Sequence, residues 1–270
     1  MPDKGEALGL TVISQARHRS IERLALSAPT LAGLVVVPVL FNLAVWQLRD
    51  ELSAGWAAIF AFWLTKLEIA GAVVERATHP TLFEIPLPHV DVAASLPDSV
   101  TWLVATAVTI LVWLAALRLR EKYLPLRYFL LFVLFIQITS LLFFAVAPER
   151  FPHSASGYID GELKTEFGFL LLLPWGHALM YYVFDFSWPR KIGLTLMTLA
   201  FVVIAVPLQL TLHVYVLARC SLLLMPLLSF VLGPTLIVFG CIALYGWAMS
   251  WRRERELPVG KHVSRGTGAV

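Results

Sequence analysis

The chain has 270 residues, of which 59% are hydrophobic and only 14% are charged, and its mean hydropathy is +0.77. Soluble domains are about 45–50% apolar and about 25% charged, so this composition excludes an ordinary soluble domain. Several apolar runs reach the roughly 20 residues that a helix needs to cross a bilayer. The composition predicts an all-α, polytopic membrane protein built as one helical bundle. The net charge of +3 decides little, because the placement of charge between loops carries the information.

Apolar segments divide the chain into one bundle and two polar tails. Residues 1–28 form a basic tail, residues 29–250 the transmembrane bundle, and residues 251–270 a second tail. The first apolar run lacks a small-residue cleavage site, so we expect it to be a retained anchor. In chain order, the apolar segments are residues 29–47, 54–73, 101–117, 126–147, 167–186, 192–216 and 221–250.

Basic residues predict which of these segments cross the membrane. Clusters of Arg and Lys lie at residues 17–23, 118–127, 190–191 and 252–255. Cytoplasmic loops carry an excess of Lys and Arg, and all four clusters are cytoplasmic only if residues 54–73 do not cross. That segment also contains Lys66 and Glu68. We therefore expect about six spans in a bacterial inner (plasma) membrane, with both termini cytoplasmic and residues 54–73 re-entrant or interfacial. The outer loops are then residues 48–100 and 148–166.

Residues 74–102 form the one polar, proline-rich stretch between apolar segments. From Ile85 to Val92, the residues Ile, Leu, His and Asp alternate with prolines and valines. A period of two indicates a strand rather than a helix. Strand backbone exposed to lipid would leave its amides unsatisfied, so it must lie outside the hydrocarbon or be buried in protein. We expect a short strand-like outer loop that roofs any site.

Histidines and carboxylates collect on the predicted outer face. His153, Asp160 and Glu162 are the candidate catalytic residues, because imidazole with carboxylate can move protons. Arg219 is a candidate for binding an anionic headgroup or a partner carboxylate. The other candidate binding residues are His89, Asp91 and Asp98. The alternative interpretation is two solvated loops whose charges keep them out of lipid.

Other kinds of site lack their sequence signatures. There is no HxxH, HExxH or HxxxD spacing, so no metal site is predicted, and no Gly-rich phosphate loop or serine hydrolase elbow is present. We predict no cofactor and no nucleic-acid partner. Polar residues inside the spans are expected to hydrogen-bond neighbouring helices rather than line a ligand pathway. These residues are Gln137, Thr139, Ser140, Gln209, Thr211 and His213.

The layout of residues 55–186 resembles that of the exosortases and archaeosortases, which are membrane transpeptidases that process proteins with C-terminal sorting signals. Ile85-Pro86 and the run from Val90 to Ser95 are similar to the strand-like outer run of that family, which leads into a helix. Phe151-Pro152-His153 lies in the outer loop where the family carries its catalytic histidine. His153 is therefore the possible counterpart of that residue.

The chain departs from the family at two catalytic positions. Where the family has its cysteine nucleophile, this sequence reads Leu96-Pro97-Asp98-Ser99-Val100, and where it has an arginine, the sequence reads Phe135-Ile136-Gln137-Ile138-Thr139. Without a thiolate no acyl-enzyme forms, and Ser99 has no evident base in the local sequence. The resemblance implies a pseudoenzyme, similar to the exosortase-associated membrane proteins. Its partners would be membrane lipids, a sorting enzyme and its C-terminally tagged substrates.

The sequence predicts a non-catalytic accessory protein in exosortase-type protein sorting or envelope export. One alternative is a membrane-embedded enzyme that acts on lipid or polyprenyl-linked substrates through the outer His/carboxylate site. A second alternative is a small-solute transporter, although charged residues within the predicted spans are scarce.

Overall fold

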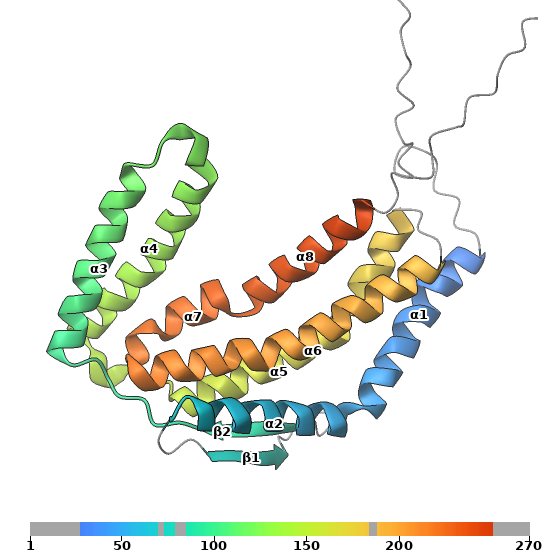
Figure 1. Ribbon diagram of the computed structural model, residues 1–270, viewed down its shortest axis with the longest axis horizontal. Coiled ribbons are helices and arrows are strands. Elements are labelled where there is room, and N and C mark those ends of the chain that lie inside the picture. Colours follow the sequence, from blue (N-terminus) through green and yellow to red (C-terminus); the bar gives the residue numbers. More distant parts are fainter. Residues whose placement is uncertain (1–27, 70–72, 79–84, 184–187, 251–270) are drawn as a thin grey trace, which may run out of the picture.

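The computed structural model describes residues 28–69, 73–78, 85–183 and 188–250. The predicted tails, with their basic clusters at residues 17–23 and 252–255, lie outside these residues. Where it is described, the chain is helical almost throughout (Figure 1). The helices are α1 (Ala28–Gln47), α2 (Arg49–Lys66), α3 (Ser99–Leu117), α4 (Leu124–Val146), α5 (Ala155–Val183), α6 (Trp188–Arg219), α7 (Met225–Leu232) and α8 (Pro234–Ser250).

Helix length and composition confirm an all-α membrane protein. The stretches Ser99–Leu117, Glu121–Val146, Trp188–Arg219 and Leu222–Ser250 are each long and apolar enough to cross a bilayer. A fifth candidate joins Gly33–Gln47 to Arg49–Lys66, but these two helices are bent by 59° relative to each other. The bend fits the prediction that the second apolar segment is re-entrant or interfacial.

The centre of the molecule is the pair of long helices α5 and α6 (Figure 1). Helix α1 packs against α5, and α8 packs against α6. Along α5 the buried apolar residues recur every three or four positions, at Ile159, Leu163, Phe167 and Leu170, so one face of this helix is turned inward. Because lipid is as apolar as these side chains, close packing rather than exclusion from water stabilises the contact.

Helix α2 is held on the bundle by a tryptophan that donates a hydrogen bond to an unpaired backbone carbonyl of α6. Pro207 lies inside α6 and has no N–H, so the carbonyl of Val203, four residues earlier, lacks its helical donor. The indole N–H of Trp56 donates to that carbonyl at 2.9 Å. Phe60 and Leu64 on the same face of α2 are also buried, whereas Trp63 is partly exposed. One face of α2 is therefore docked against α6.

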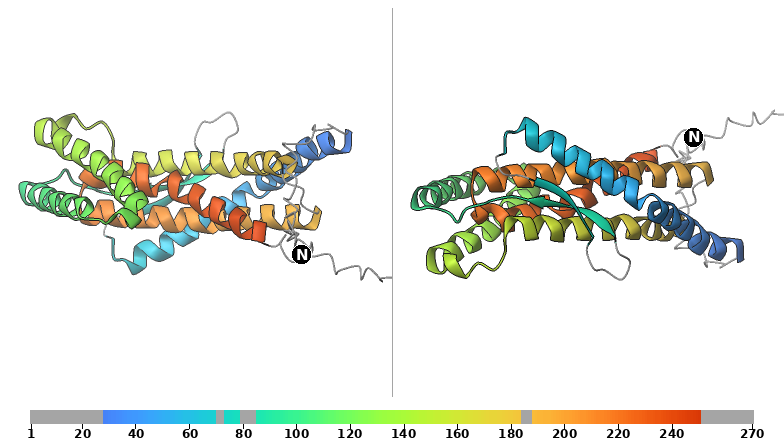
Figure 2. Two further views of the ribbon diagram at one scale, coloured as in Figure 1. Left: turned by 90° about the horizontal axis from the view of Figure 1, so that it is seen from above. Right: turned by 90° about the horizontal axis from the view of Figure 1, so that it is seen from below.

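A β-hairpin covers the end of the bundle beside α2, which we call the hairpin end (Figures 1 and 2). It consists of β1 (Val73–Thr78) and β2 (Pro86–Asp91), paired antiparallel with Val73 opposite Asp91. The strand predicted from the alternation at residues 85–92 is confirmed; its pairing with β1 was not predicted. Strand β2 contacts α2 and α5 and buries Leu87 and Val90, so its backbone is shielded by protein.

The segment at residues 148–166, predicted as an outer loop, is helical in its second half. Helix α5 begins at Ala155, so residues 155–166 form its first three turns instead of a solvated loop. The physical reason is the apolar periodicity described above, which extends back through Ile159 to Ala155, both buried. This correction moves two predicted site residues, Asp160 and Glu162, onto a helix.

Trp56→Phe should destabilise the protein by about 1–3 kcal/mol, because it leaves the partly buried Val203 carbonyl without a donor. Pro207→Ala restores the backbone N–H, so the same Trp56→Phe change should cost less in the Pro207→Ala background. Thermal unfolding in detergent micelles measures both effects. Trp63→Phe on the exposed face of α2 is the matched control. An equal loss of stability on Trp56→Phe in the wild-type and Pro207→Ala backgrounds would contradict this explanation.

Candidate functional site: a buried polar cluster at a helix break

Three polar residues of α5 point into the bundle one helical turn apart. Tyr158, Glu162 and Glu166 occupy a single face because they are spaced by four residues. Glu166 is fully buried, with 0% of its surface exposed, and Glu162 is 8% exposed. Carboxylates are almost never buried to this extent unless they are paired. We call Tyr158, Glu162 and Glu166, with the residues of α6 and α7 described next, the polar cluster.

A break between α7 and α8 faces these carboxylates. At Gly233 the backbone leaves the helical conformation, with φ −78° and ψ −139°, and Pro234 then begins α8 without needing a donor of its own. A Cβ atom at Gly233 would lie 2.2 Å from the Ser229 carbonyl oxygen and 3.4 Å from Glu162 Oε2. Only glycine fits here, and the chain breaks between α7 and α8 at this point.

His213 of α6 connects the break to α5. Its Nε2–H donates to the carbonyl of Leu232, the last residue of α7, at 3.2 Å. This assigns the proton to Nε2, so Nδ1 accepts the hydroxyl proton of Tyr158 at 3.1 Å. The phenol and imidazole rings are also stacked, with their centroids 6.0 Å apart. The prediction that His213 bonds neighbouring helices is confirmed.

Glu162 and its neighbours have more hydrogen-bonding capacity than the cluster uses. Ser229 of α7 donates its hydroxyl to Glu162 Oε1 at 2.7 Å. Within the described part of the chain, Glu162 Oε2, both carboxylate oxygens of Glu166 and both amide atoms of Gln209 are buried without a partner. The prediction that Gln209 bonds a neighbouring helix is therefore wrong. Buried unsatisfied groups are rare in folded proteins and point to a bound water, ion or ligand.

Gln209 lies at the level of Glu162. Helices α5 and α6 run antiparallel, with Tyr158 opposite His213. Moving one turn along each helix brings Gln209 opposite Glu162. The cluster therefore gathers unused oxygen atoms from two helices beside the end of a third.

A second polar group lies farther along the same pair of helices. His177 Nδ1 is 3.2 Å from the Thr195 hydroxyl, and Tyr181 donates to the Lys191 carbonyl at 3.0 Å. His177 lies eleven residues after Glu166, which is about 16.5 Å along a helix and just over three full turns. Both residues therefore lie on the same face of α5. The residues between them on that face are apolar.

The hairpin is fastened to α5 by two of the predicted binding residues. His89 Nδ1 lies 2.8 Å and 3.0 Å from the two oxygens of Asp160. Ser156 donates to Asp91 Oδ1 at 2.9 Å and accepts the backbone N–H of Val92 at 3.1 Å. His89, Asp91 and Asp160 thus hold the predicted roof in place, and we call these contacts the hairpin latch.

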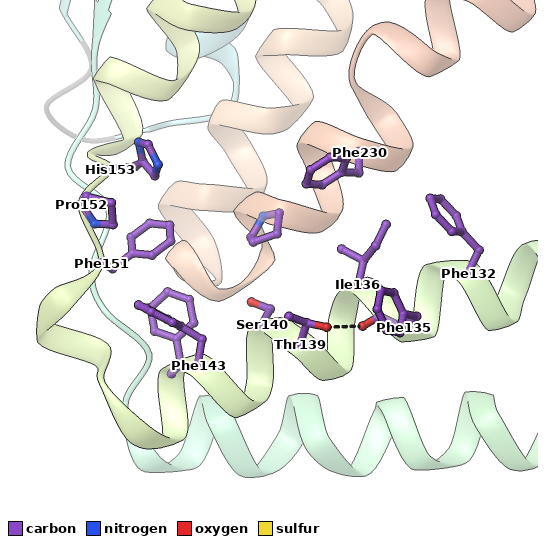
Figure 3. Close-up of a pocket in the computed structure, with 12 residues that line it drawn as sticks. Phe132, Phe135, Ile136, Thr139, Ser140, Phe143, Phe151, Pro152, His153 and Phe230 are labelled. Carbon is purple, nitrogen blue, oxygen red and sulfur yellow. Dashed lines mark hydrogen bonds between the residues drawn. The ribbon is translucent and has the colours of Figure 1, made fainter.

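The remaining predicted site residues do not join this arrangement. His153 lies at one end of an apolar pocket between α4 and α7 (Figure 3). Arg219 donates to the Leu67 carbonyl at 3.2 Å and lies over the ring of Tyr215. The structure therefore does not bring His153, Asp160 and Arg219 together as an enzyme of the predicted kind requires. Among the described residues, no three His, Cys, Asp or Glu side chains form a group that could hold a metal ion.

Asp98, one of the predicted binding residues, caps α3. Its side chain accepts the backbone N–H of Thr101 at 2.8 Å. Hydrogen bonds from the side chain and backbone of Thr101 hold the pKa of the Asp98 carboxyl below its usual value. The carboxylate is thus occupied as a helix cap.

Comparison of the chain with protein-family models, curated proteins and solved structures gives no match. The resemblance to exosortases therefore stays a prediction. Tyr158 and Glu166 were missed as site residues because the predicted loop hid the first turns of α5. The four-residue spacing of the apolar residues Ala155, Ile159, Leu163 and Phe167 is the sequence signal that would have revealed this helical face.

The hairpin latch should show energetic coupling. In a double-mutant cycle, His89→Ala and Asp160→Ala should together cost less than the sum of their separate effects. The coupling should be about 0.5–1 kcal/mol, because the pair is partly exposed. Unfolding free energies measured in detergent test this, with Glu149→Ala in place of Asp160→Ala as the control. Additive effects would show that the contact contributes nothing.

Proposed function

We propose that this protein is a transporter that moves a small monovalent cation across the membrane in exchange for protons, with Glu162 and Glu166 as the ion-binding residues. The observation that carries the proposal is the buried carboxylate of Glu166, which has no hydrogen-bond partner among the described residues. Ionisable residues within membrane bundles typically mark ion pathways and proton relays.

The energetic argument rests on two neighbouring carboxylates. An isolated buried carboxylate loses its hydration without compensation, and two of them also repel each other. Glu162 and Glu166 are close enough to interact electrostatically. A bound proton or cation offsets both costs, so the pair favours binding a positive ion from either side.

The ligand atoms suit a hard cation. The unused acceptors are carboxylate and amide oxygens of Glu162, Glu166 and Gln209, and oxygen ligands suit such ions. The α7 C-terminus, which carries partial negative charge, ends beside them. Helices interrupted within the membrane, with such termini at the ion site, recur in secondary transporters.

The break at Gly233 supports a moving part. Helices α7 and α8 meet there without continuous helical hydrogen bonding, so α7 can change its angle while α8 remains against α6. The second polar group at His177 and Thr195 lies along the same interface and provides a site for a proton on the way to the other side.

We further propose that the protein lies in a bacterial inner membrane with both termini in the cytoplasm. The turn between α3 and α4 carries Arg118, Arg120 and Lys122, and it lies on the side opposite the β-hairpin, as does the start of α6 (Figure 1). The positive-inside rule favours placing that side in the cytoplasm and the hairpin outside.

Glu166→Gln should reduce cation-driven proton flux at least about tenfold, because it removes the charge that binds the ion. Purified protein is reconstituted into liposomes containing a pH-sensitive dye, and Na⁺ or K⁺ gradients are imposed. Glu162→Gln should also reduce flux, whereas Glu149→Gln, an exposed carboxylate, should not. Flux equal to that of empty liposomes with both ions would refute the proposal.

A non-catalytic role in protein sorting is the second candidate. It is supported by Asp98, whose carboxylate caps α3 in the region where the resembled enzymes carry their nucleophile. In this proposal the protein presents C-terminally tagged substrates to a separate sorting enzyme through its outer face. The enzyme alternative is less well supported, because His153, Asp160 and Arg219 have separate contacts.

The two candidate functions predict different results for the Glu166→Gln variant. If the protein serves sorting, deleting its gene should leave tagged proteins uncleaved, and Glu166→Gln should restore cleavage as well as the wild type does. Immunoblotting of a tagged substrate measures this. Normal cleavage in the deletion strain would exclude the accessory role, and the liposome experiment is unaffected by that result.

A further inference from the structure

A group of side chains that the proposed transport does not use lines an apolar pocket between α4 and α7 (Figure 3). The pocket has a volume of about 480 Å³. Half of its twelve lining residues are phenylalanines, namely Phe132, Phe135, Phe143, Phe144, Phe151 and Phe230. His153 lies at one end and Phe132 at the other (Figure 3).

The pocket walls offer a ligand almost no polar contact. The Thr139 hydroxyl donates to the Phe135 carbonyl at 2.9 Å, and the Ser140 hydroxyl donates to the Leu223 carbonyl at 2.6 Å. Both hydroxyls are therefore occupied within the protein. His153 is exposed, and its imidazole can donate a hydrogen bond to a ligand.

The rim of the pocket faces the surrounding lipid. Phe135 is 69% exposed and Phe230 is 62% exposed, and both belong to stretches that are apolar enough to cross the membrane. His153 lies between the end of α4 and the start of α5, close to the hairpin end. The pocket thus runs from the membrane surface at His153 into the hydrocarbon along α4.

The dimensions of the pocket distinguish a lipid chain from a protein helix. A helix about 10 Å in diameter fills roughly 80 Å³ for each ångström of its length, so 480 Å³ would hold only about one turn. From Phe132 to Phe143 the lining residues of α4 extend over about 16 Å. A narrow slot of that length fits a single extended hydrocarbon chain.

We propose that the pocket binds one acyl chain of a membrane phospholipid, with the phosphate group hydrogen-bonded by His153. The charged side chain of Arg150, three residues earlier, is exposed in the same segment and favours an anionic headgroup. The acyl chain fills the space between α4 and α7, where the helix pair α3–α4 joins the rest of the bundle. The bound phospholipid therefore stabilises the attachment of this helix pair.

Photocrosslinking in vesicles tests this site. The full-length protein is reconstituted into phosphatidylglycerol that contains a small fraction of the same lipid with a diazirine in its acyl chain. Irradiation and peptide mass spectrometry should find crosslinks enriched at least fivefold on the pocket-lining residues of α4 and α7 relative to α3, whose apolar surface is lipid-facing throughout.

Two substitutions on α4 separate the pocket from the general lipid surface. Ile136→Trp fills the pocket and should reduce these crosslinks at least fivefold, whereas Ile138→Trp, on the same helix but outside the pocket, should leave them unchanged. If Ile136→Trp fails to fold, His153→Ala is the second test. It should reduce crosslinking by the phosphatidylglycerol probe but not by a diacylglycerol probe with the same chains.

Three results would overturn the proposal. Crosslinks spread evenly over all lipid-facing helices would show that the pocket holds only bulk lipid. Unchanged crosslinking in both Ile136→Trp and His153→Ala would show that neither end of the site matters. Preferential capture of an isoprenoid phosphate probe over the phospholipid, in the same vesicles, would assign the pocket to a different occupant.

Discussion

The constraint on which this structure depends is that polar groups placed among apolar helices must find their partners inside the protein. The clearest case is the Val203 carbonyl, which Pro207 deprives of its helical donor and which Trp56 satisfies from another helix. This single hydrogen bond explains why α2 is fixed against α6 rather than free at the membrane surface. The position of α2 then supports β2, and β2 in turn is fastened to α5.

Buried polar groups that lack a hydrogen-bond partner gather at the polar cluster. Trp102, Ser140 and His213 each use their side chains to satisfy a backbone carbonyl. Glu166 and Gln209 do not, although both are buried. Among the described residues, Asn42 and Gln137 each leave one buried oxygen without a partner, but Glu162, Glu166 and Gln209 bring several such atoms together beside the end of α7. A bound water, proton or ion would offset the free-energy cost of burying these oxygens, and this supports the proposed ion site.

Much of the fold was predictable because hydrophobic runs and period-two alternation are local signals. The four stretches that are long and apolar enough to cross a bilayer and the strand at residues 85–92 are visible in the sequence. The burial of Glu166 was not, because a carboxylate at the edge of an apolar run is compatible with either a loop or an inward helical face. Whether the segment forms a loop or an inward helical face depends on how α6 and α7 pack against it, and the local sequence does not show that packing. The same reason hides the pairing of His89 with Asp160, which are 71 residues apart.

The geometry at Gly233 joins the break and the carboxylates into one unit. An added Cβ there would collide with the Ser229 carbonyl and approach Glu162 Oε2, so the space that the missing side chain leaves is the space beside the carboxylate. Ser229 also donates to Glu162, and Leu232 accepts from His213, so any change in the angle of α7 alters contacts on both α5 and α6. Asp160, which holds the hairpin, is two residues from Glu162 on the same helix. The proposed ion site therefore contacts α7 through Ser229 and lies on the same helix as the hairpin latch.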